Sequence, residues 1–166
     1  LRATNNVFQS DQGIRLLVTG VGRKNLNQSF ARFARTEFAK ESQQVSPAWL
    51  NIGIAGHREL AVGEMMIANK ISCAVSAQSS FPTPVLSGNH YGEVLTVDEP
   101  ELTYPQNSAY DMEAHAFWDK ALNYGVLDLI QCCKLISDNP QGGVETITSA
   151  VIDEIFCAAS YEIRQH

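Results

Sequence analysis

The chain of 166 residues is long enough to bury the core of one domain, and its 45% hydrophobic and 18% charged residues are typical of a globular protein. A formal net charge of −6 repels a polyphosphate backbone, which argues against nucleic acid as a partner. No apolar run has the length that a bilayer requires and no signal-peptide pattern precedes the first strand, so we expect a cytoplasmic protein with no membrane partner.

The first half of the chain predicts strands with one helix between them. Apolar runs over 14–19, 49–54 and 64–75 predict strands, the last run forming one or two of them. Aromatic and small residues recur at helical spacing over 30–38, which predicts an amphipathic helix. The prolines, glycine and serines of 78–91 are typical of a surface loop.

The second half continues the alternation. We expect a strand over 93–97, a loop over 99–107, a helix over 113–124, a nearly continuous apolar strand over 127–137 and a last helix over 145–164. Strands that alternate with helices predict an α/β fold, built as a three-layer α/β/α sandwich. No repeat or linker interrupts the sequence, which indicates a single domain over 1–166.

The cysteines and histidines do not indicate a metal site. Cys73, Cys132, Cys133 and Cys157 lie in apolar stretches without a CxxC pair, and the four histidines do not pair at metal-ligand spacing. We therefore expect buried, reduced thiols and no metal.

Two glycine-containing segments follow predicted strands. Gly20-Val21-Gly22 is either a turn whose amides face a ribose or phosphate, or a tight turn that needs no side chain; we favour the tight turn. Gly53-Ile54-Ala55-Gly56 either lets a ligand approach the strand end or permits close helix packing, with neither preferred. His57 adjoins this second segment and is the one histidine of interest.

Two carboxylates stand at element ends. Glu113, after Met112, begins a helix, where it is either a charge favoured by the helix dipole or an acceptor for both hydroxyls of a ribose. Asp138 ends the most apolar strand and is either a turn former, with Asn139 and Pro140 after it, or a partly buried acid that protonates a leaving base.

The order of these segments resembles the nucleoside phosphorylase family, including its methylthioadenosine/adenosylhomocysteine nucleosidases. Four segments are similar to family motifs: Leu16–Gly22, Leu50–Gly56 with Val62-Gly63-Glu64 after it, Asp111-Met112-Glu113-Ala114, and Lys134–Asp138. The resemblance implies a mixed sheet between helices, a small-molecule nucleoside as ligand, no cofactor, and a homodimer or larger homo-oligomer. It also implies that the chain lacks the family's first strand.

The same resemblance implies roles for individual residues. Glu113 and Met112 would bind the ribose, Gly56 would line the pocket near the sugar, and Asp138 would hydrogen-bond the base and assist its departure. His57 and Lys134 stand where the family has a glycine and an arginine, so they are further candidates for substrate binding.

The family's chemistry leaves three functions open. We expect cleavage of the N-glycosidic bond of a purine-type nucleoside with water as nucleophile. The alternatives are a phosphorylase with phosphate as co-substrate, for which Arg23, Lys24 or Arg58 would bind the anion, and a non-catalytic nucleoside-binding relative, which Ile54 in place of the family's small hydroxyl residue favours.

Overall fold

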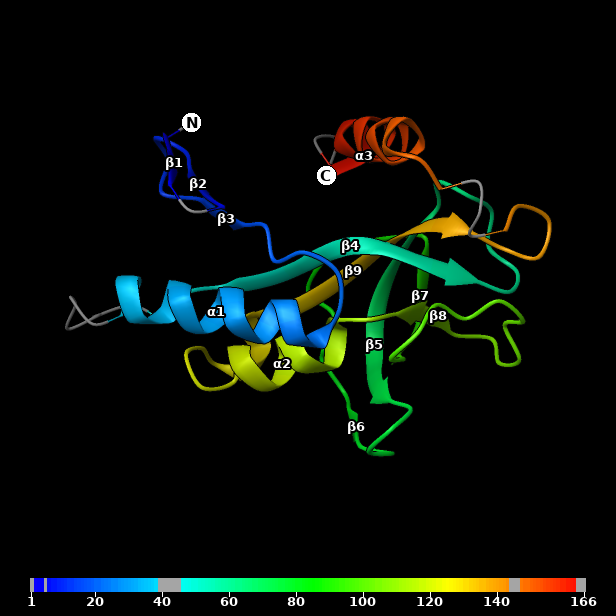
Figure 1. Cartoon of the computed structure of the whole chain (residues 1–166), viewed down its shortest axis with the longest axis horizontal. Helices are drawn as coiled ribbons and strands as arrows, with labels where there is room; N and C mark the ends of the chain where they lie inside the picture. Colours follow the sequence, from blue (N-terminus) through cyan, green and yellow to red (C-terminus); the bar gives the residue numbers. More distant parts are fainter. Residues whose placement is uncertain (1, 5, 39–45, 144–146, 164–166) are drawn as a thin grey trace.

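The computed structural model describes residues 2–4, 6–38, 46–143 and 147–163, which form two sheets and three α-helices (Figure 1). A small antiparallel sheet near the N-terminus has the order β1-β2-β3, with strands Arg2–Thr4, Val7–Gln9 and Arg15–Leu17. The expected strand over 14–19 is therefore real but short, and it belongs to this separate sheet.

The larger sheet has six strands in the order β6-β5-β7-β8-β4-β9. Their bounds are β4 Trp49–His57, β5 Met65–Cys73, β6 Ser79–Ser80, β7 His90–Thr96, β8 Ala109–Asp111 and β9 Ile130–Asp138. The sheet is mixed, because β9 runs parallel to β4 but antiparallel to β5. The predicted α/β fold with a mixed sheet is confirmed.

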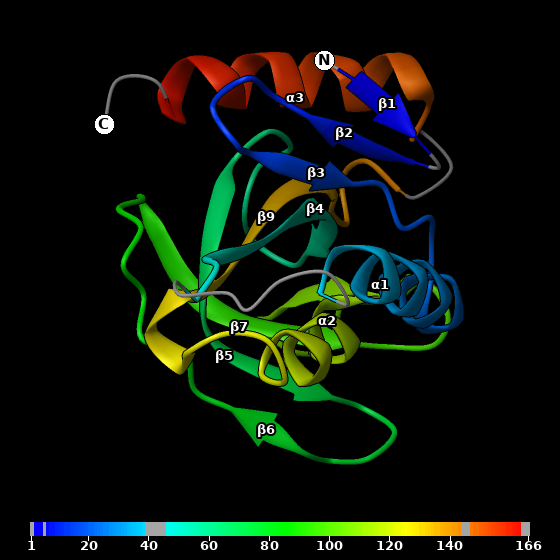
Figure 2. The same ribbon diagram turned by 90° about the vertical axis from the view of Figure 1, so that its left-hand side faces the viewer.

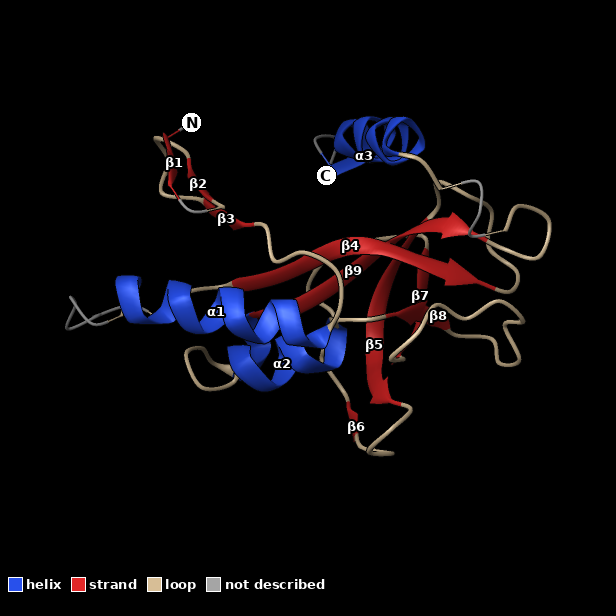
Figure 3. Ribbon diagram, in the orientation of Figure 1, coloured by secondary structure: helices blue, strands red, loops and turns tan. Residues whose placement is uncertain are grey.

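The larger sheet closes on itself. Met65, Met66 and Ile67 of β5 pair with residues 133–135 of β9, so β5, β7, β8, β4 and β9 form a closed barrel. The expected three-layer sandwich is not confirmed, because an open central layer would leave β5 and β9 unpaired with each other. In Figure 3, β9 runs along β4 and ends above it in the view, whereas β5 descends below β4.

The helices flank the barrel on two sides (Figure 2). Helices α1 (Arg23–Glu37) and α2 (Ala114–Ala121) pack together, whereas α3 (Ser149–Ile163) packs on β9. The ends of the expected last helix, at 145–146 and 164, lie outside the described residues. None of the described helices combines the length and the apolar character needed to cross a bilayer.

The buried position of β9 explains why its sequence is a nearly continuous apolar run. All nine residues of β9 are buried, since β4 and β5 pair with its two edges and helices cover it. Trp118 and Phe117 of α2 pack into the same core as Ile130 and Ile136. Strand β8 was not expected from the sequence, because three residues are too few to show a period.

Candidate functional site

A cavity of about 210 Å³ opens where β4, β8 and β9 end. Its walls come from the end of each of these strands, from the start of α2 and from the loop after β7. The lining residues that carry polar or acidic groups are Glu101, Tyr110, Asp111, Glu113, Ser137 and Asp138, and the apolar ones include Val21, Ile54, Val97, Pro100, Met112 and Ile147. The carboxyl end of a strand is where ligands bind in many α/β proteins.

Asp138 is held in this cavity by a local irregularity of the sheet. Ala55 pairs with Ile136 but Gly56 pairs with Asp138, so Ser137 is an extra residue in β9 at this point. Asp138 is only 4% exposed. The Ser137 hydroxyl donates a hydrogen bond to Asp138 Oδ1, and the Tyr104 hydroxyl donates one to Asp138 Oδ2. Each carboxylate oxygen thus has one protein donor and keeps a second lone pair for a ligand.

Tyr104 reaches Asp138 only because Gly56 has no side chain. A Cβ on Gly56 would lie 2.6 Å from Tyr104 Cε1 and against the Asp138 carboxylate. Tyr104 has a left-handed backbone, with a φ of 46°, and its side chain is buried with the ring packed edge-on against Tyr110. Burial and the hydrogen bond to Asp138 raise the pKa of the Tyr104 phenol, so this group remains a donor.

Glu113 lines the same cavity as Asp138. It is the N-cap residue of α2, and its carboxylate accepts a hydrogen bond from the backbone N–H of Gly22. Gly20 and Gly22 have φ values of 77° and 89°, which supports the tight-turn interpretation of this segment. Burial raises the pKa of Glu113, and the neighbouring Asp111 adds to this effect.

Asp111, the last residue of β8, organises the start of α2. Its Oδ2 accepts hydrogen bonds from the backbone N–H groups of Glu113 (3.2 Å) and Ala114 (2.7 Å), while its Oδ1 accepts one from the Thr96 hydroxyl at 2.7 Å. Lys134 Nζ lies 2.7 Å from Asp111 Oδ2, and both side chains are almost fully buried. This ion pair fixes the backbone from which Glu113 projects.

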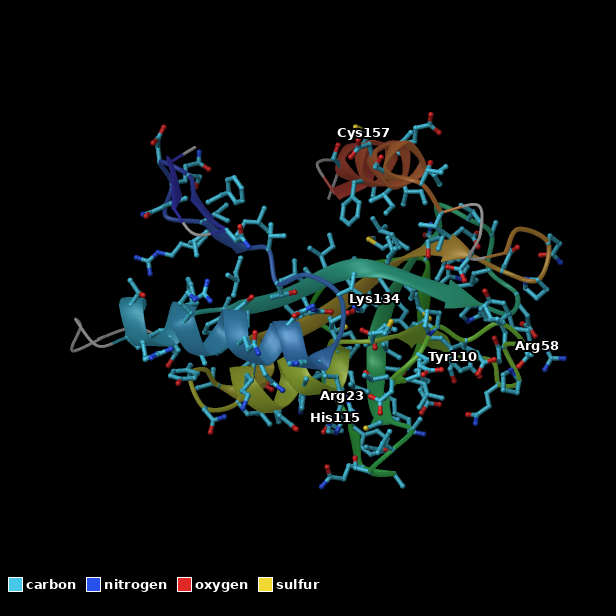
Figure 4. The ribbon with its side chains drawn as sticks, viewed as in Figure 1. Arg23, Arg58, Tyr110, His115, Lys134 and Cys157 are labelled. Carbon is cyan, nitrogen blue, oxygen red and sulfur yellow. The ribbon has the colours of Figure 1, made fainter. Side chains whose placement is uncertain are left out.

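Lys134, a candidate for substrate binding, is not among the residues that line the cavity. Its ammonium group binds the carboxylate of Asp111, which does line it. Burial acts to lower the pKa of Lys134, but the charge of Asp111 outweighs burial and the pKa is raised. Figure 4 shows Lys134 within the molecule and Arg58 at its periphery.

His57 also lies away from the cavity. Its Nδ1 accepts hydrogen bonds from the backbone N–H groups of Glu59 and Leu60, both at 3.0 Å. Burial lowers the pKa of His57, which keeps the ring neutral and able to accept these bonds. His57 thus stabilises the turn after β4, and the expectation that it binds substrate is not supported by its position.

The structure brings four of the six expected site residues to one cavity: Gly56, Met112, Glu113 and Asp138. The sequence-based prediction of site residues did not include two residues that contact Glu113 or Asp138. Asp111 precedes a helix at a position typical of an N-cap, which was a usable signal. Tyr104 is the loop aromatic nearest the family's base-stacking position, but a hydrogen bond to Asp138 was not expected from the sequence. Within the described parts of the chain, no three His, Cys, Asp or Glu residues are grouped to hold a metal ion.

The fold is similar to that of several bacterial nucleosidases. The 5′-methylthioadenosine/S-adenosylhomocysteine nucleosidase of Neisseria meningitidis, in complex with methylthio-immucillin-A, gives a TM-score of 0.61 at 16% identity over 90% of this chain and 76% of that chain. The Streptococcus pneumoniae enzyme in complex with 8-aminoadenine gives 0.61 at 20% identity over 92% and 78%.

A third nucleosidase, that of Colwellia psychrerythraea in complex with adenine, gives a TM-score of 0.58 at 14% identity over 86% of this chain and 71% of that chain. No protein-family model and no curated protein sequence matches this chain. At these identities the likeness establishes the fold. The resemblance to the nucleoside phosphorylase family that the motifs indicate is thus confirmed at the level of the fold.

Proposed function

We propose that the protein hydrolyses the N-glycosidic bond of a purine-type nucleoside. The observation that carries this proposal is that Asp138 and Glu113 both line one small cavity. The similarity of the fold to nucleosidases crystallised with adenine and with nucleoside analogues supports the same substrate class.

The two carboxylates serve different ends of the substrate. Glu113 accepts hydrogen bonds from the ribose hydroxyls, and Met112 packs against the apolar face of the sugar. Asp138 faces the base and stabilises the proton that the base gains as it departs. Cleavage of a glycosidic bond passes through a state with positive charge on the sugar, which nearby carboxylates stabilise.

Water is the nucleophile that the cavity favours. Within the described part of the chain, no lysine, arginine or histidine lines this cavity. A phosphate ion in it would therefore lie beside carboxylates with no cation to bind it. Arg23 is paired with Asp98, and Lys134 is paired with Asp111. The cavity thus has no cationic side chain among its lining residues, and hydrolysis is preferred to phosphorolysis.

A non-catalytic nucleoside-binding protein is the second candidate. It is favoured by Ile54, which presents an alkyl group at the cavity, and by the two hydroxyl donors that already occupy the Asp138 carboxylate. Such a protein would bind a nucleoside without releasing its base.

The test is a panel of purine nucleosides, including 5′-methylthioadenosine, assayed for free base with and without phosphate. We expect release of base and free ribose without phosphate, and its loss in Asp138→Asn. Asp128→Asn, which changes an exposed aspartate in the 3₁₀ helix (Leu127–Leu129) that precedes β9, is the matched control and should retain activity. Thermal stabilisation by adenine or a nucleoside with no base release in any condition would refute hydrolysis and support the binding protein. Release that requires phosphate would show a phosphorylase.

A further inference from the structure

The N-cap residue of α2, Glu113, does not cap the helix with its own side chain. An N-cap side chain ordinarily accepts a hydrogen bond from the N–H group of the second or third helical residue. Among the residues that the structure describes, the Glu113 carboxylate accepts no such bond from α2. It accepts one from the backbone N–H of Gly22 instead, and it lines the cavity. The first amides of α2 therefore need other acceptors, since Ala114 and His115 are buried.

Two side chains of the barrel strands supply these acceptors. Asp111 of β8 accepts the N–H groups of Glu113 and Ala114. The hydroxyl of Thr96, the last residue of β7, accepts the N–H group of His115 at 3.0 Å. The same hydroxyl donates to Asp111 Oδ1 at 2.7 Å. Three successive amides are thus bound by two linked side chains, which we call the Thr96–Asp111 clasp.

The Thr96 hydroxyl is used in both directions. A backbone N–H only donates, so the Thr96 oxygen must be the acceptor for His115. A hydroxyl has one proton, and Thr96 gives it to the Asp111 carboxylate, which is the acceptor in the ion pair with Lys134. A residue without a hydroxyl can make neither bond, so one side chain controls both connections of the clasp.

The clasp belongs to a rigid part of the sheet. Thr96 and Asp111 are register partners in the parallel pair of β7 and β8, and the backbone N–H of Val97 donates to the backbone oxygen of Asp111 at 2.8 Å. Thr96 is only 1% exposed and is not among the residues that line the cavity. It can therefore act on a substrate only through the groups that it holds, of which the start of α2 carries Glu113.

Recognition of the sugar depends on where the Glu113 carboxylate lies. Because the clasp caps α2, this carboxylate is available for the ribose hydroxyls. A ribose offers two neighbouring hydroxyls, whereas a 2′-deoxyribose offers one. A site that is built to bind a substrate hydroxyl discriminates strongly against the analogue without it, because the acceptor is then left unpaired. Such discrimination requires an acceptor that is held in place.

We propose that Thr96 is a positioning residue for Glu113 and that it sets the selectivity of the cavity for a ribonucleoside over its 2′-deoxy analogue. The inference rests on the proposed function, in which Glu113 binds the ribose. Removal of the Thr96 hydroxyl releases the first turn of α2 from β7 and lets the carboxylate shift. The contact with the 2′-hydroxyl then weakens, while the contact of Asp138 with the base is unchanged.

The test compares adenosine with 2′-deoxyadenosine in the wild type, Thr96→Val and Thr96→Ser. Valine has the shape of threonine without the hydroxyl, and serine keeps the hydroxyl. Two selectivity ratios are measured: that of kcat/KM for base release and that of the association constants from titration calorimetry. We expect Thr96→Val to lower both ratios about tenfold or more, and Thr96→Ser to keep them within about twofold of the wild type.

The matched control is Ser72→Ala. Ser72 is another buried strand hydroxyl, and it is bound to the Ser79 hydroxyl at 2.9 Å rather than to α2. This variant is expected to keep both ratios even where its stability in urea falls. An unchanged ratio in folded Thr96→Val would overturn the proposal, even with slower turnover, because a purely structural role lowers the rates on both sugars equally. A wild-type ratio near one would overturn it as well.

A further variant decides the case in which Thr96→Val does not fold. The thiol of Thr96→Cys is only a weak donor and acceptor, so the ratios are expected to fall in this variant too, and wild-type ratios would overturn the proposal. The calorimetric ratio does not depend on turnover. Absence of base release with normal binding would therefore end the hydrolysis proposal, while the binding ratio would still decide the role of Thr96. Absence of binding by both nucleosides would overturn both proposals.

Discussion

The backbone of Gly56 lies so close to Asp138 and Tyr104 that β4 has no room for one methyl group at this position. In Gly56→Ala the new Cβ would lie 2.6 Å from Tyr104 Cε1, whereas an ordinary contact begins at 3.4 Å. Both Tyr104 and the Asp138 carboxylate must therefore move, Tyr104 by about 0.8 Å, because an Asp138 oxygen would lie even closer to the new Cβ. The backbone conformation itself accepts alanine, because Gly56 does not have a positive φ.

A displacement of about 1 Å at a reacting group can reduce a rate about 100-fold. Overpacking of a filled site costs about 1–3 kcal/mol of folding free energy. We therefore expect Gly56→Ala to fold, to unfold at lower urea concentration, and to lose about two orders of magnitude in kcat/KM for base release. Steady-state kinetics on the best nucleoside of the panel and urea unfolding measure the two effects.

Gly53→Ala in the same strand is the matched control, because its Cβ would meet only Lys134 Nζ at 3.4 Å. This variant is expected to retain most of its activity. Wild-type kcat/KM in Gly56→Ala would refute the reasoning, since it would mean that the position of Asp138 does not limit the reaction.

Three further changes test the groups around the cavity. Burial raises the pKa of Glu113 above that of an exposed glutamate, so the folded state binds more protons than the unfolded state and stability falls as pH rises from the ordinary glutamate pKa through the folded pKa. In Glu113→Gln this fall is expected to be absent from urea unfolding measured between about pH 4 and pH 8; an unchanged pH dependence would contradict the assignment. Lys134→Met leaves the Asp111 carboxylate without its cation and is expected to lower the free energy of unfolding by about 3 kcal/mol. Adding Asp111→Asn should recover part of that loss, and strictly additive costs would show that the pair is not coupled. Tyr104→Phe keeps the buried ring but removes the hydroxyl donor to Asp138, so kcat is expected to fall about tenfold with little change in KM; a rise in KM alone would argue that the hydroxyl contacts the substrate.

Much of the secondary structure can be predicted from the local pattern of the sequence. The apolar run that becomes β9 and the helical spacing that becomes α1 are recognisable because each element is long enough to repeat its period. The identity of Glu113 and Asp138 as acids at element ends is also a local property. Both ends meet at one cavity in the structure, as the sequence indicates.

Pairing between distant segments is what only the tertiary structure decides. Closure of the barrel depends on the pairing of β5 with β9, which more than fifty residues separate in the sequence. The hydrophobic pattern of a strand does not predict which other strand it pairs with. The positions of His57 and Lys134 are decided in the same way, because each polar group binds a neighbour that the fold provides: a turn amide for His57 and Asp111 for Lys134. A buried polar group binds whatever donor or acceptor the fold places beside it, and that neighbour is set by three-dimensional packing.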